Sequence, residues 1–350
     1  MKNHIIVTHA GSFHADEAMA IALLEKYYLP APTHMALGVE SETIAQWLTN
    51  QSQPSAPRLF YPDGVEECRT PSIVVRTRDA SLLKAARANP EVFVVDVGGE
   101  YDAKALNFDH HQSHMKQTWD DGTPLSSTGL IWKWLESQNL LKEVHADVRT
   151  ELVDKLIKPL DSHDNGLVNF PPASQLAGYN RASDNPDEQN RQFAKAKQVM
   201  SDVLENTIFT AELKLEAKQV LSKGWAKAQS FGDTHVLLRD HISYHDCAML
   251  LKEISQGKAD MVVIPGQGNR FSLISTPKDT GFSIKTPVPE QWRGKMDQTV
   301  NINGKNIMIR FAHKSGFMCV VEGTHKDAQA VARYVIAQNT TPQNKRGAKM

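Results

Sequence analysis

Short apolar runs alternate with segments of helical periodicity along the first half of the chain. Residues 5–7, 72–75 and 92–97 are rich in β-branched and aromatic side chains, which predicts buried strands. Residues 15–28 and 80–88 place apolar side chains at helical spacing, which predicts helices. This alternation predicts an α/β fold with a doubly wound and mostly parallel sheet.

The middle of the chain is predicted to be mainly helical. Helices are expected over residues 43–48, 126–138 and 144–157, with a loop over residues 51–57. The proline-bearing stretch 169–185 is also expected to be a loop. A long pattern rich in Ala, Lys and Glu then predicts one or two helices over residues 193–229, forming a bridge between domains.

The last third predicts a smaller α+β domain. Strands are expected over residues 235–238, 261–264, 307–311 and 318–321, and a final helix over residues 324–338. The predicted organisation is a catalytic domain over residues 1–190, a helical bridge over 191–230, a substrate-binding or lid domain over 231–340, and a flexible tail over 341–350.

Composition and charge narrow the class of protein. With 41% hydrophobic and 23% charged residues, the chain is typical of a packed globular protein. A net charge of −1 excludes binding of nucleic acid or membrane by bulk charge alone. Residues 281–350 nevertheless hold eleven basic and four acidic side chains. This basic portion fits either an anionic substrate or attraction between the two halves of the chain.

The cysteines and the apolar runs argue against a disulfide-rich protein, a thiolate zinc protein and a membrane protein. Cys68, Cys247 and Cys319 are too few and too scattered for a disulfide framework or a thiolate zinc site. No run approaches the ~20 apolar residues that span a bilayer, so no membrane partner is expected. A cytoplasmic location is the default expectation. The sequence leaves open whether the chain forms a homo-oligomer.

Histidines and aspartates cluster at four places where predicted strands or helices end. They are His9, His14 and Asp16; Asp96; Asp109, His110 and His111; and Asp161 and Asp164. Each residue alone has a structural interpretation, because aspartates often cap turns and helices. In an open parallel sheet, however, ligands bind beyond the carboxyl ends of the strands, where these clusters would meet. Their conjunction therefore predicts a metal site.

The mixture of donors indicates which ions such a site would hold. Crowded carboxylates repel one another and need cations. Imidazoles among carboxylates suit Mn²⁺, Fe²⁺, Co²⁺ or Zn²⁺ better than Mg²⁺. There are more ligands than one ion needs, which favours two divalent ions, as in phosphoryl hydrolysis. Mn²⁺ is the first expectation, with Mg²⁺, Co²⁺ and Zn²⁺ as alternatives.

These motifs resemble those of the melanocyte proliferating gene family, a group of DHH-like predicted metal-dependent hydrolases. The resemblance extends over residues 4–338 and is carried by eight short segments. They are residues 8–18, 76–79, 95–102, 108–112, 125–130, 161–166, 292–294 and 311–317. It implies a metal-dependent phosphodiesterase, and eukaryotic members are described as 3′–5′ RNA exonucleases.

The resemblance also implies roles for individual residues. One ion would be held by His9, His14 and Asp96, and the other by Asp16, Asp96, His110 and either Asp161 or Asp164. His111 would face the substrate phosphate or assist the leaving group. The commonest form of the superfamily has aspartate at the position of His14. The interval between His9 and His14 is also one residue longer than in that form. His14 is therefore the ligand that departs most from the family pattern.

The leading hypothesis is a 3′–5′ exonuclease that cleaves RNA or short oligonucleotides with a water activated by two metal ions. Candidate phosphate ligands are Arg76, Arg78, Arg293, Arg310 and Lys314. Phe282, Trp292 and Phe317 are candidates for base stacking. One alternative is a phosphohydrolase acting on pyrophosphate or a dinucleotide. The other is a catalytically inactive metal-binding module with a regulatory role.

Overall fold

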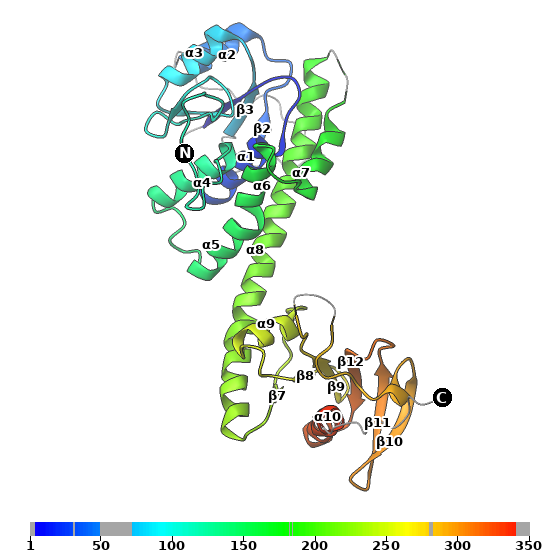
Figure 1. Ribbon diagram of the computed structural model, residues 1–350. Coiled ribbons are helices and arrows are strands. Elements are labelled where there is room, and N and C mark those ends of the chain that lie inside the picture. The colour runs from blue at the N-terminus through cyan, green and yellow to red at the C-terminus, as the bar shows by residue number, and fades with distance from the viewer. Residues whose placement is uncertain are drawn as a thin grey trace, which may run out of the picture. The chain divides into compact units, whose positions relative to one another are not determined.

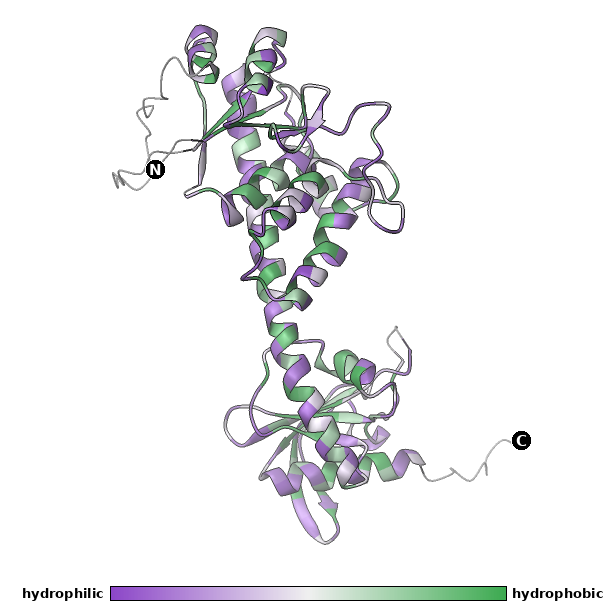
Figure 2. Ribbon diagram, turned by 90° about the vertical axis from the view of Figure 1, so that its left-hand side faces the viewer, coloured by the Kyte–Doolittle hydropathy of each residue, from purple (hydrophilic) through white to green (hydrophobic). Residues whose placement is uncertain are grey.

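The computed structural model (Figure 1) describes residues 4–30, 32–49, 72–181, 183, 185–279 and 283–340. Cys68, Phe282, the expected loop 51–57 and the expected tail 341–350 lie outside these residues. The chain divides into two compact units, Met1–Ala211 and Glu212–Met350. The boundary between them falls within the 45-residue helix α8 (Pro186–Ser230), which Figure 2 shows with hydrophobic and hydrophilic residues alternating along its length.

The first unit is built on a mostly parallel six-stranded sheet, as predicted. The order is β2-β3-β1-β4-β6-β5, and only the β5–β6 pair at one edge is antiparallel. The strands are β1 (Ile5–Thr8), β2 (Thr33–Met35), β3 (Ser72–Arg76), β4 (Val92–Val95), β5 (Tyr101–Asp102) and β6 (Asn107–Phe108). β1, β3 and β4 are buried throughout, because helices cover both faces of the sheet centre.

Helices complete the first unit. They are α1 (Ala15–Tyr27), α2 (Ser41–Leu48), α3 (Ala80–Ala88), α4 (Ser127–Ser137), α5 (Ala146–Leu152), α6 (Lys158–Asp164) and α7 (Pro171–Leu176). Trp47 of α2 and Leu82 of α3 pack with Val7 and Val94 in one buried cluster. α1 and α4 contact each other, and the Thr128 hydroxyl donates a hydrogen bond to the Asp16 carbonyl.

Two predictions about the helices need correction. The helix expected over residues 144–157 continues through a π-helical turn, Val153–Ile157, into α6. The stretch expected to be a loop, residues 169–185, contains α7 and a 3₁₀ turn at Ala177–Tyr179. Prolines suggested a loop there, but Pro171 and Pro172 lie in the first turn of α7, where a missing N–H costs no hydrogen bond.

The second unit is a separate six-stranded sheet of order β10-β11-β12-β9-β8-β7. Its strands are β7 (His235–Leu237), β8 (Met261–Pro265), β9 (Arg270–Ser275), β10 (Met296–Ile302), β11 (Lys305–Ala312) and β12 (Met318–Glu322). Only β7 and β8 pair in parallel. Met261 and Val263 join a core with α10 (His325–Thr340). Val262 and Ile264 join another with α9 (Cys247–Ile254) and the end of α8.

The sequence patterns therefore predicted an α/β fold with a separate sheet domain, and the structure confirms it. The predicted domain bounds at residues 190, 230 and 340 remain predictions. Within the described residues, no helix combines the length and apolar character needed to cross a bilayer.

Candidate metal centre

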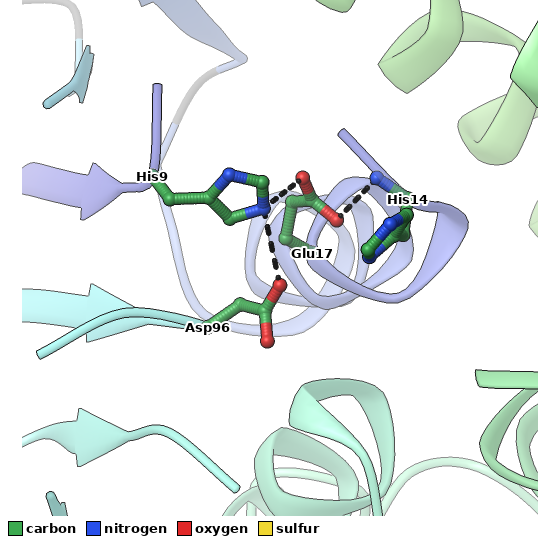
Figure 3. A group of neighbouring side chains, drawn as sticks. All are labelled: His9, His14, Glu17 and Asp96. Carbon is green, nitrogen blue, oxygen red and sulfur yellow. Dashed lines mark hydrogen bonds and ion pairs between the residues drawn. The ribbon is translucent and has the colours of Figure 1, made fainter. Parts of the chain in front are cut away.

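The loop between β1 and α1 brings two imidazoles and a carboxylate together (Figure 3). The chain turns at Gly11, whose φ of +90° lies in the region that favours glycine. The Glu17 side chain accepts a hydrogen bond from the His14 backbone N–H at 3.0 Å, which closes the first turn of α1. The other Glu17 oxygen lies 2.9 Å from His9 Nε2. Glu17 is thus fixed against His9, although its side chain was not expected to be in the site.

Asp96 is the central carboxylate of the site. It directly follows β4 and has a φ of +58°, a left-handed conformation that Asp tolerates better than most residues. Its Oδ2 lies 3.3 Å from His9 Nε2, and its Oδ1 lies 3.3 Å from His110 Nε2. The Ser127 hydroxyl donates a hydrogen bond to Oδ1 at 3.0 Å. Asp96 therefore joins histidines that are about one hundred residues apart in the chain.

His110, Asp16 and Asp164 form the opposite side of the centre. His110 Nε2 lies 3.2 Å from Asp164 Oδ2 and 3.8 Å from Asp16 Oδ2. Asp164 also approaches His14, with 3.9 Å between its Oδ1 and His14 Nδ1. Loop residues, the first turn of α1 and the last turn of α6 thus meet beyond the carboxyl end of β4. This is the position expected for a ligand site in an open α/β sheet.

Potential ligand atoms fall into three overlapping groups whose members all lie within 4.8 Å of one another. The groups are His9, His14, Glu17 and Asp96; Asp96, His110 and His111; and His14, Asp16 and Asp164. Asp96 and His14 each belong to two groups. Among the described residues, seven of the candidates predicted from the sequence lie together, and Glu17 joins them as an eighth. The seven are His9, His14, Asp16, Asp96, His110, His111 and Asp164.

The centre has unsatisfied buried acceptors, and this fits a cation. Both oxygens of Asp16 are buried without a hydrogen-bond partner, while Glu17 Oε1 and Asp96 Oδ2 share the single His9 Nε2. Burying anionic oxygens in this way is costly unless they are paired or coordinate a metal. Burial, reinforced by the charges of Asp96 and Asp164, raises the pKa of Asp16 well above its usual value. The residues present can hold a metal ion, because carboxylates and imidazoles are the donors that Mn²⁺, Co²⁺ and Zn²⁺ accept.

The histidines and Asp96 stabilise each other's charged forms. Burial would lower the pKa of His9, but Asp96 and Glu17 raise it to about 10. Burial likewise opposes ionisation of Asp96, yet hydrogen bonds from His110 and His9 hold its pKa well below the usual range. Protons and a divalent cation thus compete for the same ligand atoms, which is general for sites of this kind.

Asp161 and Asp164 have different surroundings. Asp161 is buried and accepts hydrogen bonds from Trp119 Nε1 at 2.7 Å, from the N–H and hydroxyl of Ser126, and from Gly129 N–H at 3.0 Å. These donors occupy both of its oxygens. Asp161 belongs to none of the ligand groups found among the described residues, whereas Asp164 does. The contacts of Asp161 are those of a residue that joins α4 to α6.

Alanine variants at these two positions are expected to behave differently. Asp161→Ala leaves buried donors of Trp119, Ser126 and Gly129 unsatisfied, so the free energy of unfolding should fall by about 3 kcal/mol or more. Asp164→Ala should change stability little and reduce metal content. Urea denaturation, paired with elemental analysis of each folded variant, distinguishes the two. Equal destabilisation by both variants would contradict the separate roles.

His111 is oriented by Asp109. Its Nδ1 lies 2.7 Å from Asp109 Oδ1, and its backbone N–H donates to the same oxygen at 3.1 Å. The other Asp109 oxygen accepts a hydrogen bond from the Gly99 N–H. The His111 side chain is 58% exposed, and the hydrogen bond to Asp109 raises its pKa. His111 is therefore a fixed and accessible donor at the edge of the centre.

Arg76 and Arg78 hold the ligand-bearing loop. Arg78 donates to the Ala10 carbonyl at 2.7 Å and lies 3.1 Å from His9 Nδ1. Arg76 donates to the Gly11 carbonyl at 2.7 Å. Its guanidinium also lies 5.2 Å and 4.7 Å from the ring centres of Phe13 and Phe193. The sequence predicts phosphate contacts for both arginines, whereas their contacts in the structure position the loop that carries His9 and His14.

Arg76→Ala is therefore expected to disturb the loop. Removing the guanidinium leaves the Gly11 carbonyl without this donor and deletes two cation–π contacts, each worth about 0.5–2 kcal/mol. Metal affinity should fall by about tenfold, the lower range for loss of an outer-shell partner. Metal titration of Arg76→Ala beside Arg333→Ala, which removes an exposed arginine of α10 in the second unit, measures this effect. Equal affinities in the two variants would show that Arg76 does not position the loop.

The other predicted phosphate and base contacts lie in the second unit. Arg310 is paired with Glu322 and Asp297, and Arg293 Nε donates to the Val288 carbonyl at 2.8 Å. Lys314 is exposed. Two predicted stacking residues make contacts within the unit: Trp292 is buried against Tyr334, and Phe317 lies against His313. A role for these five residues in substrate binding remains a prediction.

Fold and centre together define a mixed α/β protein with a buried carboxylate–histidine site able to hold a metal ion. The family model described as "Uncharacterised protein family (UPF0160)", MYG1_exonuc, matches residues 65–336, and the chain belongs to this family. The "MYG1 protein" of Dictyostelium discoideum is 27% identical, covering 91% of this chain and 92% of the relative. The "MYG1 exonuclease" of Rattus norvegicus is 26% identical and that of Homo sapiens 25%, each covering 96% of this chain and 86% of the relative.

Proposed function

We propose that this protein is a metal-dependent phosphodiesterase of the exonuclease type that acts on RNA or short oligonucleotides. The observation that carries the proposal is the arrangement of histidine and carboxylate donors in two sets around Asp96, with both buried oxygens of Asp16 lacking a hydrogen-bond partner. The names of the rat and human relatives, "MYG1 exonuclease", support this class of reaction.

The two donor sets suggest two ions. His9, His14, Glu17 and Asp96 would hold the first, and Asp16, Asp96, His110 and Asp164 the second, with Asp96 shared. Two divalent ions, Mn²⁺ being the best fit to this donor mixture, would supply a nucleophilic water at neutral pH and neutralise charge on the phosphate.

The remaining groups of the centre bind and orient. Asp109 fixes the His111 ring, which is exposed at the edge of the centre and offers an N–H to a phosphate oxygen or to the leaving oxygen. Ser127 fixes the Asp96 carboxylate. Arg78 fixes the loop that carries His9, so the imidazole keeps its orientation during turnover.

Metal removal tests the proposal directly. After treatment with EDTA and desalting, hydrolysis of a labelled RNA oligonucleotide should fall to background, and Mn²⁺ should restore it. Progressive shortening of a 5′-labelled strand would show removal of nucleotides from the 3′ end. Hydrolysis that persists unchanged in EDTA would contradict a metal-dependent reaction, and restored cleavage only at internal sites would contradict the exonuclease type.

A further inference from the structure

Two cavities adjoin the proposed metal centre along the β1–α1 loop. The first, about 390 Å³, is lined by His14, His163 and Asp164 among others, and we call it the His14 cavity. The second, about 420 Å³, is lined by Gly11, Ser12, Tyr179, Asn180, Arg181 and Gln189 among others, and we call it the Arg181 cavity. Phe13 and Asn180 line both. The cavities are therefore neighbours, and only the His14 cavity includes proposed metal ligands.

The wall between the cavities is fixed by hydrogen bonds. The Asn180 side chain accepts from the Phe13 N–H at 2.9 Å and donates to the Phe13 carbonyl at 2.6 Å. Phe13 is buried and packs edge-to-face on Phe193 of α8, with 5.3 Å between ring centres. Asn180 and Phe13 thus join the segment after α7 to the ligand-bearing loop. The Arg181 cavity consequently has a defined position next to the metal centre.

The Arg181 cavity is lined by one exposed arginine and one half-buried tyrosine. Arg181 carries the single charge among its lining residues, and it forms no ion pair within the described part of the chain. The half-buried Tyr179 ring packs against no other aromatic ring there. A guanidinium matches a phosphate by a bidentate fork, and a tyrosine ring offers a stacking surface to any base. The volume lies in the usual range for small-molecule sites.

We propose that the Arg181 cavity binds the nucleotide adjacent to the scissile phosphodiester, with its phosphate on Arg181 and its base on Tyr179. This rests on the proposed function and deepens it, because it identifies the substrate as a strand of at least two nucleotides. Pyrophosphate would reach the metal centre without filling this cavity. Arg181 and Tyr179 are thereby specificity-determining residues for a nucleic-acid strand.

Kinetics test the proposal on two substrates. Arg181→Ala should lower kcat/KM for an RNA tetranucleotide by at least about tenfold, the effect of one charge-assisted hydrogen bond. Its effect on bis(p-nitrophenyl) phosphate should be much smaller, because that compound lacks a second phosphate. Arg191→Ala is the control, since it removes an exposed charge of α8 that does not line the cavity. Tyr179→Phe should retain more activity on RNA than Tyr179→Ala.

Binding separates failure of this inference from failure of the proposed function. A fluorescein-labelled RNA tetranucleotide is titrated in EDTA, followed by fluorescence anisotropy. We expect Arg181→Ala to weaken binding at least about tenfold and Arg191→Ala to leave it within twofold. Equal losses in the two variants, or no binding by the unmodified protein, would overturn the subsite. Specific binding without turnover of either substrate would support the subsite and contradict the proposed function.

Discussion

Asp96→Ala is expected to reduce RNA hydrolysis by about 10³-fold or more, because it removes several kcal/mol of metal-dependent transition-state stabilisation. Asp96 contributes to both donor sets and contacts His9 and His110 at 3.3 Å each. Its loss should also release both ions, which elemental analysis of the purified variant would show. The initial rate on an RNA oligonucleotide at saturating Mn²⁺ measures the effect on turnover.

Two further variants serve as controls for Asp96→Ala. Asp96→Asn preserves the shape of the side chain and its hydrogen bond from Ser127. A loss of activity in this variant would therefore come from the loss of the negative charge. Ser127→Ala removes only the orienting hydroxyl and should have a smaller effect, about tenfold. Unchanged turnover and unchanged metal content in Asp96→Ala would contradict the proposed metal centre.

Glu17→Gln is expected to lower the metal content from two ions per chain to one. The amide oxygen can still accept the hydrogen bond from the His14 N–H, so the first turn of α1 should be preserved. The substitution would remove the negative charge of Glu17, whose Oε1 lies 2.9 Å from His9 Nε2. Affinity for the first ion should therefore fall by more than about 100-fold, because losing a ligand costs more than losing a residue that only orients one.

Isothermal titration calorimetry with Mn²⁺ measures the number of bound ions and their affinity. Comparison with a control variant distinguishes the loss of a ligand from the loss of one negative charge elsewhere. Glu136→Gln on α4 provides the matched control, because that carboxylate pairs with Lys133 on the surface. Circular dichroism establishes that α1 is intact in both variants. Two ions bound to Glu17→Gln with unchanged affinity would remove Glu17 from the ligand set.

The sequence predicted the centre of the first sheet, and it singled out most of the side chains that the structure brings together, for identifiable physical reasons. β1, β3 and β4 are buried on both faces, so their sequences are nearly continuous apolar runs. His9 and Asp96 follow two of these strands, which are parallel neighbours, and therefore emerge at one edge. Short or half-exposed strands such as β5 and β9 lack such a run, so the hydrophobic pattern does not predict them.

Other features of the site depend on contacts between distant segments. Asp161 and Asp164 are three residues apart on one helix, so spacing alone places both on the same face. Trp119 and Gly129 lie more than thirty residues earlier in the chain and donate hydrogen bonds to Asp161. These contacts between distant segments are what separate Asp161 from Asp164. The position of Glu17 had one local signal, its place three residues after the helix N-cap His14, which is the spacing of a capping box.

The most direct test of the central claim is anomalous diffraction from crystals grown with Mn²⁺, measured on both sides of the manganese absorption edge. We predict two anomalous peaks per chain that share Asp96 as a ligand, one beside His9 and Glu17 and the other beside His110 and Asp164. Well-ordered side chains with no anomalous peak at Asp96, despite saturating Mn²⁺, would contradict the account.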